Sequence, residues 1–381
     1  MTRLLFIFYT LFIYKEPEMA KGFTLSILPW AYYAQFMHNS VWKEHFTLKP
    51  YLPPDEESKL PEKEYNELLQ KRNSFPELPL VNYTSQYGMG CFEGLKAFPQ
   101  KDGSLKIFRP DKNAARMKRS MEGLKMPSFP EEVFTAAVLD ITRRNRDLGF
   151  TPEYSPDWEK DDFSSGHSVY IRPFSYSEPA IGLGLSERPY VVIIATPVGA
   201  YFKAGNSKAV TTEKVRAFPG GTGWIKCDAN YVVPTLAKKE AEADGYMEAV
   251  FLDAAEQKYL EEGSSCNIFI YLENGSLVTP ALGDTILEGI NRSSVLTLAE
   301  DMGIQTEERK ITIEEAMTAG KEMFVTGTAA GVSFIESITH QGKTKEYAGG
   351  KPGELTIALR KRLKGIQYGV EEDSFGWMVE V

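Results

Sequence analysis

The segment from Gly220 to Tyr231 constrains this sequence more than any other feature, because three glycines precede one lysine, Lys226. A lysine beside several glycines can lie where other backbone comes close, and such a residue could carry a cofactor. Tyr231 follows five residues later and opens a helical pattern, in which Pro234 is tolerated in the first turn and Gly245 suits the end. The pattern therefore places Lys226 at the exit of one element and Tyr231 at the entry of the next.

Two simpler interpretations of this segment compete with a cofactor lysine. A nucleotide-binding loop of the form G-x-x-x-x-G-K-[ST] requires Ser or Thr after the lysine, and Cys227 stands there. A surface lysine after a glycine turn also fits, and the segment taken by itself favours that interpretation. The rest of the chain must therefore decide whether Lys226 has a chemical role.

Composition narrows the classes of function. The chain has 381 residues, which at about 150 residues per domain predicts two domains. The formal net charge is −9 and basic residues are spread evenly, so neither a nucleic-acid surface nor a membrane surface is expected. The cysteines Cys91, Cys227 and Cys266 lie far apart, without a disulfide framework or a zinc spacing, and the four histidines form no ligand-spaced group. We therefore predict no metal site and a reducing, cytoplasmic location.

The start of the chain carries an apolar run at residues 4–13. This run is too short to span a bilayer, which needs about 20 residues, and no small-x-small cleavage site follows it closely. Residues 1–30 are therefore interpreted as an N-terminal extension, and Met19 is a more natural start.

The remaining sequence divides at a glycine-containing linker. We expect a small α/β domain over residues 31–200, a linker over 201–207 and a large α/β domain over 208–381 that carries Lys226. In the small domain, apolar periodicity predicts a helix over residues 130–148.

Two turns in the second half have features of anion sites. Gly289 and Ile290 precede a helix, so free N–H groups and the positive end of the helix dipole lie there. Asn291 is also a good N-cap, and ordinary capping would explain it equally well. The turn Thr326–Gly331 can form a nest of backbone N–H groups with the hydroxyl of Thr328 added. Each of these features, taken separately, is more often a turn than a site.

Seven separated motifs nevertheless follow one another in one order along the chain. They are Arg116, Tyr170-Ile171-Arg172, the glycines with Lys226, Tyr231, Glu262-Gly263-Ser264-Ser265-Cys266-Asn267, Leu287-Glu288-Gly289-Ile290 and Thr326-Gly327-Thr328-Ala329. This order resembles the fold type IV pyridoxal-phosphate enzymes, and more closely the branched-chain amino-acid aminotransferases. The resemblance extends from about Leu80 to the C-terminus and includes Phe-Glu-Gly-Leu-Lys-Ala-Phe at 92–98 and Ile-Gln-Tyr-Gly at 366–369. It implies a mixed α/β (α+β) fold with two domains, like that of D-amino-acid aminotransferase.

The resemblance also implies the roles of the cofactor-binding residues. Lys226 would bind pyridoxal 5′-phosphate covalently and then act as the general base, which requires a lysine pKa well below about 10.4. Tyr231 would hydrogen-bond the phenolic oxygen of the cofactor, and Glu262, rather than its neighbour Glu261, would pair with the pyridine nitrogen. The full cofactor-binding set is Lys226, Arg116, Tyr231, Glu262, Ser265, Leu287, Gly289, Ile290, Asn291 and Thr328, of which Arg116, Ile290, Asn291 and Thr328 would hold the phosphate.

The substrate side follows from the same resemblance. An aromatic pocket would accept leucine, isoleucine or valine, and 2-oxoglutarate or glutamate would enter the same pocket. Tyr87 and the N–H groups of Thr328 and Ala329 would bind the substrate carboxylate, and Arg172 would order that side through Tyr87. The full substrate-binding set is Tyr33, Tyr87, Phe92, Tyr170, Arg172, Tyr201, Thr328 and Ala329. Members of the family are homodimers, and the segment Tyr154–Gly166, with Trp158, is the expected lid over the partner's site.

The sequence departs from the family pattern near the lysine and at the phosphate site. After the lysine the family usually has a Gly-Gly-Asn-Tyr or Gly-Ala-Asn-Tyr turn, whereas this chain has Cys227-Asp228-Ala229-Asn230, so Asp228 adds a negative charge close to Lys226. Asn291 stands where threonine is common. Two enzymes of the same fold, D-amino-acid aminotransferase and aminodeoxychorismate lyase, also fit the motif that begins at Glu262. A ligand-binding protein without catalysis on this scaffold is a further alternative, which the presence of both Lys226 and Glu262 argues against.

Overall fold

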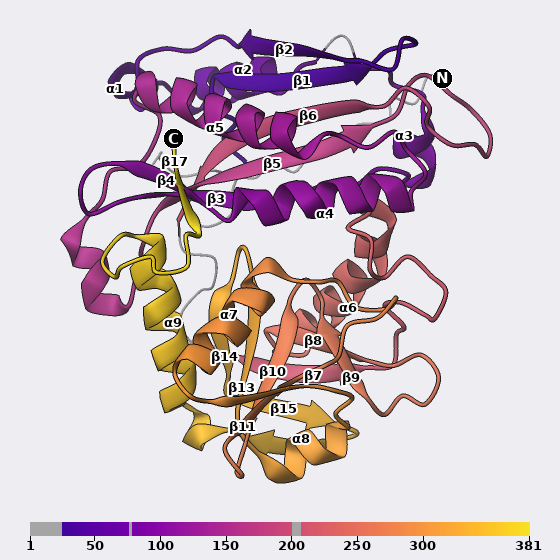
Figure 1. Cartoon of the computed structure of the whole chain (residues 1–381), viewed down its shortest axis with the longest axis vertical. Coiled ribbons are helices and arrows are strands. Elements are labelled where there is room, and N and C mark those ends of the chain that lie inside the picture. The colour runs from indigo at the N-terminus through magenta and orange to yellow at the C-terminus, as the bar shows by residue number, and fades with distance from the viewer. Residues whose placement is uncertain (1–24, 76–77, 200–206) are drawn as a thin grey trace, which may run out of the picture.

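A computed structural model describes residues 25–75, 78–199 and 207–381. The described chain forms two sheets, each with its own helices, stacked one above the other in Figure 1. The predicted Tyr201, residues 201–206 of the linker and Met19 lie outside the described residues. The predicted domain boundaries stay a proposal, and the mixed α/β fold class is confirmed.

The first sheet has seven strands in the order β17-β4-β3-β5-β6-β1-β2, and every pair is antiparallel. Its strands are β1 (Trp30–Phe36), β2 (Trp42–Leu48), β3 (Leu95–Pro99), β4 (Leu105–Phe108), β5 (Ser168–Tyr176), β6 (Tyr190–Val198) and β17 (Met378–Glu380). β17 is the last strand along the chain, yet it belongs to this sheet. The C-terminal residues therefore return to the first body, a name used here for the first sheet and its helices; the second sheet and its helices form the second body.

The helices of the first body lie between its strands in the sequence. They are α1 (Pro54–Glu57), α2 (Glu62–Arg72), α3 (Tyr83–Tyr87), α4 (Pro110–Gly123) and α5 (Glu131–Asp147), with the 3₁₀ turn η1 (Pro156–Asp161). The apolar side of α5 places Phe134, Val138 and Ile141 in the core of the first sheet, because they recur at helical spacing. The predicted helix over residues 130–148 corresponds to α5.

The second sheet has ten strands and mixed pairing. They are β7 (Lys208–Thr212), β8 (Glu248–Leu252), β9 (Leu260–Gly263), β10 (Asn267–Leu272), β11 (Ser276–Thr279), β12 (Gln305–Glu308), β13 (Gly320–Gly327), β14 (Gly331–Ile335), β15 (Ser337–His340) and β16 (Lys343–Glu346). The helical elements of this body are η2 (Asp228–Tyr231), α6 (Val232–Ala243), α7 (Ile290–Asp301), α8 (Ile313–Ala319), η3 (Ala348–Gly350) and α9 (Glu354–Gln367).

The two bodies meet where the glycine-rich segment touches the residues just before β3. An isolated antiparallel bridge joins Cys91 to Cys227, and both side chains lie in the buried core of the first sheet. Residues from both bodies therefore converge on the peptide that carries Lys226.

Candidate active site

Lys226 is held in place through its own backbone. Its N–H donates to Ser120 Oγ of α4 at 3.2 Å, and its carbonyl accepts from the N–H of Phe92 at 3.1 Å. The N–H of Asp228 donates to the carbonyl of Gly90 at 2.9 Å. These bonds flank the Cys91–Cys227 bridge as in a short antiparallel pair, so the lysine backbone cannot move without breaking a strand contact.

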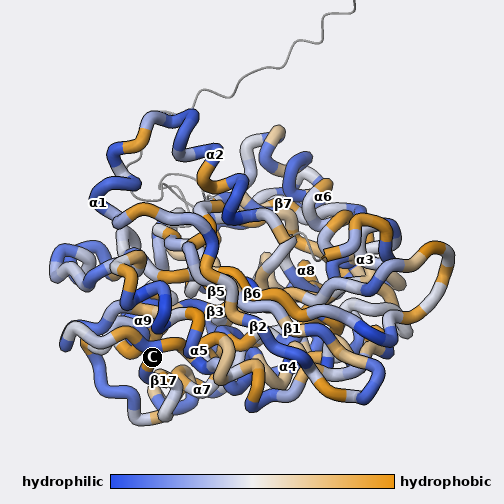
Figure 2. Tube along the Cα trace, turned by 90° about the horizontal axis from the view of Figure 1, so that it is seen from above, coloured by the Kyte–Doolittle hydropathy of each residue, from blue (hydrophilic) through white to orange (hydrophobic). Residues whose placement is uncertain are grey.

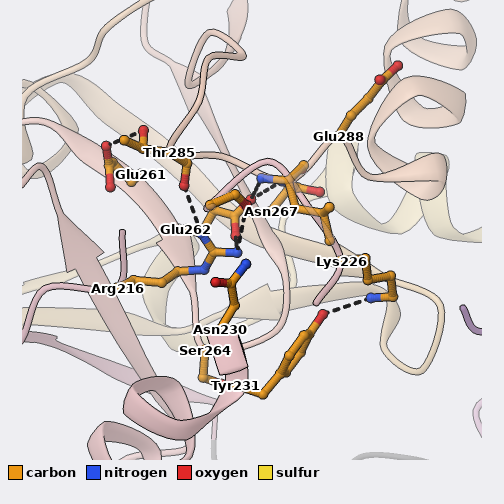
Figure 3. Close-up of polar contacts among 12 residues, drawn as sticks. Arg216, Lys226, Asn230, Tyr231, Glu261, Glu262, Ser264, Asn267, Thr285 and Glu288 are labelled. Carbon is orange, nitrogen blue, oxygen red and sulfur yellow. Dashed lines mark hydrogen bonds and ion pairs between the residues drawn. The ribbon is translucent and has the colours of Figure 1, made fainter. Parts of the chain in front are cut away.

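The amine of Lys226 faces two aromatic side chains. Its Nζ donates to Tyr231 Oη at 2.8 Å (Figure 3). The same Nζ lies 4.7 Å from the centre of the Phe92 ring. Burial lowers the pKa of Lys226 to about 8, and the nearby positive charge of Arg116 acts in the same direction. Burial likewise raises the pKa of Tyr231, so the phenol keeps its proton at neutral pH. The structure thus brings together a lysine that deprotonates readily and a neutral phenol.

Glu262 lies on β9 with both carboxylate oxygens engaged. Oε1 accepts from the N–H of Leu287 at 2.6 Å and from Asn267 Nδ2 at 3.1 Å, and Oε2 pairs with Arg216 at 2.9 Å (Figure 3). Burial raises the pKa of Glu262 to about 7, and Arg216 opposes that rise. The sequence motifs did not single out Arg216. Its place ten residues before Lys226, just ahead of the glycines, is the signal that could have pointed to it.

Glu261 points to the other side of β9, because successive side chains of a strand alternate. Its Oε1 accepts from Thr285 Oγ1 at 2.7 Å, while Oε2 is buried without a hydrogen bond within the described residues. The two neighbouring carboxylates therefore have different partners, and Glu262 alone of the two is paired with Arg216.

Arg116 of α4 is bound by a carboxylate to which the sequence motifs gave no role. Its Nε and Nη2 donate to the two oxygens of Glu93 at 2.7 and 2.8 Å, and its Nη1 donates to the carbonyl of Glu288 at 2.8 Å. Burial opposes the ionisation of Glu93, but Arg116 outweighs it, so the pKa of Glu93 lies below its ordinary value. Asn113 adds a third hydrogen bond to this carboxylate, at 2.7 Å. The guanidinium is thereby fixed, with N–H groups left for a phosphate.

Two segments predicted as anion sites lie side by side. Helix α7 begins at Ile290 with Gly289 as its N-cap, and Asn291 sits inside the helix rather than capping it. The amide of Asn291 instead donates to the carbonyl of Gly327 at 2.8 Å. Thr328 Oγ1 donates to the carbonyl of Gly94 at 3.1 Å, which ties this turn to the first sheet.

Gly289 fits only as glycine, because a Cβ there would lie 1.9 Å from Asn267 Oδ1. Leu287, just before it, donates its N–H to Glu262. Ser265 is exposed in the turn between β9 and β10. The free N–H groups of the first turn of α7 are thus set beside the Gly327–Thr328 turn.

Three predicted pocket residues line the side of Lys226 that faces the first sheet. Arg172 Nη2 donates to Tyr170 Oη at 2.6 Å, and its guanidinium lies 4.5 Å from the centre of the Phe92 ring. The rings of Phe92 and Tyr231 are 4.8 Å apart. A Cβ on Gly94 would lie 2.1 Å from Tyr170 Oη, so glycine is required at that position.

The other predicted pocket residues lie further out or in different contacts. Tyr87 ends α3, is 39% exposed, and accepts a hydrogen bond from the N–H of Gly182 at 3.2 Å. Arg172 donates to Tyr170 Oη, and the expected ordering of the carboxylate side by Arg172 through Tyr87 stays a prediction. Tyr33 stacks on His45 at 4.8 Å, on β1, which β6 separates from β5. Ala329 lies in the turn between β13 and β14.

The carboxylate of Asp228 is buried near Arg172. It is packed over Gly90, where an added Cβ would lie 2.3 Å from Oδ2. Burial raises the pKa of Asp228 to about 6, and the opposing influence comes from Arg172. The charges that act on the pKa of Lys226 are those of Arg116, Glu93, Tyr170 and Arg172.

The expected lid segment is bound to its own chain. Trp158 stacks on His167 with 5.7 Å between ring centres, and Phe163 stacks on Tyr368, next to α9, at 4.7 Å. Asp162 pairs with Arg360 of α9 at 3.3 Å. These aromatic side chains thus pack within their own chain, and their role as a lid over a partner's site stays a prediction.

Comparisons with known proteins identify relatives of the chain. Residues 90–338 match the family model of the class IV amino-transferases. Branched-chain amino acid aminotransferase 1 of Humulus lupulus, a mitochondrial protein, is 41% identical over 302 residues, which cover 77% of this chain and 72% of that one. A branched-chain-amino-acid aminotransferase of Mycobacterium tuberculosis is 39% identical over 307 residues, which cover 77% of this chain and 80% of that one.

Solved structures of branched-chain aminotransferases also resemble this chain. A branched-chain aminotransferase of Thermoproteus uzoniensis with norvaline superposes with a TM-score of 0.68 at 31% identity, over 80% of this chain and 94% of that one. The T.th. branched-chain amino acid aminotransferase with pyridoxamine 5′-phosphate has a TM-score of 0.65 at 27% identity, over 80% of this chain and 93% of that one.

Within the described part of the chain, no group of metal-binding side chains is assembled and no helix is long and apolar enough to cross a membrane.

Proposed function

The chain belongs to the class IV aminotransferases, and we propose that it transfers an amino group between branched-chain L-amino acids and 2-oxoglutarate with pyridoxal 5′-phosphate as cofactor. The observation that carries the proposal is the hydrogen-bonded pair of Lys226 and Tyr231, with Glu262 paired to Arg216 nearby. The substrate class is supported by the names of the relatives, and by the norvaline in the Thermoproteus uzoniensis structure.

The residues around Lys226 fit the proposed cofactor. Lys226 would attach it, Tyr231 would contact the ring oxygen and Glu262 the ring nitrogen. Arg116, fixed by Glu93, and the first turn of α7 would hold the phosphate. Gly289 keeps that turn open where a Cβ would collide with a neighbouring side chain. When bound, the cofactor supplies an electron sink for the charge left at the substrate Cα.

The side chains of this chain then perform the proton chemistry. Lys226, with a pKa of about 8, can be neutral at physiological pH and can take the proton from the substrate Cα and return it. Tyr231 donates or accepts a hydrogen bond at the same place without ionising, because burial raises its pKa. Arg216 favours the charged form of Glu262, which a buried carboxylate would otherwise lose near pH 7.

Substrate selection rests on the wall opposite the lysine. Phe92 and Tyr170 offer aromatic surface to an aliphatic side chain, whose burial is worth about 25 cal/mol per Å². Arg172 adds a positive charge to the same wall for a dicarboxylic substrate. We propose the backbone of the Thr328–Ala329 turn for the substrate α-carboxylate, and Tyr33, Tyr87 and Tyr201 for the outer pocket.

An amino-donor panel with 2-oxoglutarate tests the function. We expect L-leucine, L-isoleucine and L-valine to be used, and D-alanine to be inactive. Lys226→Ala should abolish turnover, since it removes the general base, while Lys239→Ala on the exposed side of α6 should leave it unchanged. Activity with D-alanine, or lyase activity on aminodeoxychorismate, without activity on L-leucine would assign the chain to another enzyme of this fold.

We also propose a homodimer. The β5–β6 loop projects beside α3 (Figure 1) and exposes Ile181 by 81% and Leu183 by 93%. Apolar segments stand out at this end of the molecule in Figure 2, and Leu80 adds an 84% exposed side chain. An apolar patch of this kind favours a protein interface, and it adjoins Tyr87 through the Gly182 hydrogen bond.

Light scattering at micromolar concentration tests the dimer. We expect twice the chain mass for the wild type and a monomer for the double variant Ile181→Asp, Leu183→Asp. A fully active wild-type monomer would refute the proposal.

We propose a cytoplasmic location, which the free state of all three cysteines supports. Fractionation of cells that express the full chain would test it.

A further inference from the structure

Lys96 is a buried lysine on the side of the first sheet that faces the second body. It lies on β3 between Leu95 and Ala97, which both point into the core of the first sheet, so its own side chain points the other way. It is 7% exposed. The register places Lys96 directly opposite Tyr170 on β5, so the two share a face. Lys96 therefore extends the wall formed by Tyr170 and Arg172.

Lys364 reaches the same place from the second body. It lies on α9, which runs beside β14 toward the edge of the first sheet (Figure 1). Its Nζ is 5.5 Å from the centre of the Phe98 ring, and Phe98 is the next residue of β3 on the face that Lys96 occupies. Gly331 makes room for it, because a Cβ there would lie 3.3 Å from Lys364 Cε and 3.7 Å from Nζ. Gln100 Nε2 donates to the carbonyl of Gln367 at 2.8 Å and fixes the end of α9 to the end of β3.

This pair of amines has no counter-charge within the described residues. Burial, with the positive charge of Lys364 acting in the same direction, lowers the pKa of Lys96 to about 7. Burial lowers the pKa of Lys364 to about 8, with Arg360 acting in the same direction. Two acidic groups lie near this part of α9: Asp162 pairs with Arg360 and Lys361, and Glu371 packs over Gly365 without an ion pair to Lys364.

Two buried cations that repel each other destabilise the folded chain, since each loses hydration without gaining a carboxylate. A bound ligand with a negative charge would offset this cost, which gives a simple reason for the two lysines to lie here. Lys96 shares the face of the first sheet with Tyr170 of the proposed pocket wall, whereas the Thr328–Ala329 turn is proposed for the α-carboxylate. A ligand with two carboxylates could therefore bind the Thr328–Ala329 turn with one and the two lysines with the other.

We propose that Lys364, reaching across from the second body, completes with Lys96 a subsite for the distal carboxylate of the dicarboxylic substrate, glutamate or 2-oxoglutarate. This inference rests on the proposed function and names two further residues that decide between its substrates. A branched-chain substrate brings no charge to the pair, so it gains nothing from the two amines.

Lys96→Met and Lys364→Met test the subsite, because methionine keeps most of the side-chain volume and removes the charge. We expect each variant to raise the KM for glutamate and 2-oxoglutarate at least about tenfold, which corresponds to one lost charge-assisted hydrogen bond. The KM for L-leucine should change less than about twofold on the same scale. Lys101→Met is the matched control, because Lys101 pairs with Glu159 at the surface and is expected to change neither value.

Binding and stability give independent readouts. Calorimetric titration with glutarate should show weaker binding in both variants, while 4-methylvalerate, a monocarboxylate, should bind as in the wild type. Without ligand, Lys96→Met should melt at a higher temperature than the wild type, because the variant no longer buries an unpaired cation. A structural role for Lys96 predicts the opposite, a lower melting temperature, and that result would overturn the subsite.

The kinetic outcomes separate this inference from the proposed function. If the wild type transaminates leucine and the variants keep the wild-type ratio of glutamate to leucine efficiency, the subsite is wrong and the proposed function stands. If the wild type does not transaminate leucine but glutarate binding still depends on Lys96 and Lys364, the dicarboxylate site stands and the proposed function is wrong.

Discussion

Removing Arg216 should destabilise the protein in a way that depends on pH. Arg216 pairs with Glu262 at 2.9 Å, and the two side chains have exposed fractions of only 5% and 4%. Even with this partner, the pKa of Glu262 rises from 4.5 to about 7. That rise corresponds to about 3 kcal/mol against the ionised form, at about 1.36 kcal/mol per pH unit. Without Arg216 the pKa of Glu262 rises further, because the main opposing charge is lost.

The sign of the pH effect follows from proton uptake. A carboxyl group with a raised pKa binds more protons in the folded chain than in the unfolded chain, so folding stability falls as pH rises from 4.5 through the folded pKa. In Arg216→Met this window extends to higher pH. We expect the variant to lose about 3–5 kcal/mol at pH 8, the typical cost of breaking a buried ion pair. At about pH 5 Glu262 is protonated in the variant, and the loss should be smaller.

Urea unfolding of the protein without cofactor, followed by tryptophan fluorescence at both pH values, measures this loss. Arg119→Met is a matched control, because Arg119 pairs with Glu288 at 2.8 Å but the side chains are 42% and 48% exposed. The control should lose less than about 1 kcal/mol at either pH. A loss for Arg216→Met that equals the control, or that is the same at both pH values, would refute the reasoning about Glu262.

Three further predictions concern the catalytic groups. Borohydride reduction of the holoenzyme should label Lys226. The rate of cofactor incorporation should increase as the pH rises toward the Lys226 pKa of about 8 and then level off, as a stopped-flow pH series would show. In steady-state assays, Glu262→Gln should lower kcat by orders of magnitude, whereas Glu261→Gln should have a mild effect. The reverse order would contradict the assignment of Glu262. Gly94→Ala should reduce stability by about 1–3 kcal/mol and raise the KM for leucine, because the new methyl group collides with Tyr170 Oη. Thermal melts and kinetics of that variant would check both effects.

The local patterns of the sequence predicted the elements of the site better than their contacts. Lys226 and Tyr231 lie five residues apart on either side of a turn, so their contact is local and follows from the glycine segment and the helix start. The start of α7 was equally visible from the sequence, although Asn291 turned out to bond the Gly327 carbonyl rather than cap the helix. The cap preference of asparagine was outweighed by a tertiary partner.

Contacts between distant segments could not be read from the sequence. Glu93 and Arg116 are separated by a hairpin, and only the fold shows that a buried carboxylate fixes that arginine. Cys91 and Cys227 lie far apart in the chain, yet they form one antiparallel bridge. The expected lid stays a prediction, but the contacts of its aromatic residues could not be inferred from the sequence either. Its aromatic residues read as exposed binding groups, whereas Tyr368, at the end of α9, supplies the buried surface on which Phe163 packs.

The charges around the lysine explain why Lys226, rather than another cation of the site, is suited to proton transfer. Arg116 is neutralised by Glu93 and Arg216 by Glu262, and in each pair the partners are almost wholly buried. Lys226 donates to a phenol instead of a carboxylate, so within the described residues nothing comparable stabilises its charged form. A buried amine beside an arginine keeps its proton only weakly, which is why the pKa of Lys226 drops to about 8. Replacing Tyr231 by an acidic residue would therefore restore the lysine's proton affinity and remove the base, although the lysine itself remained.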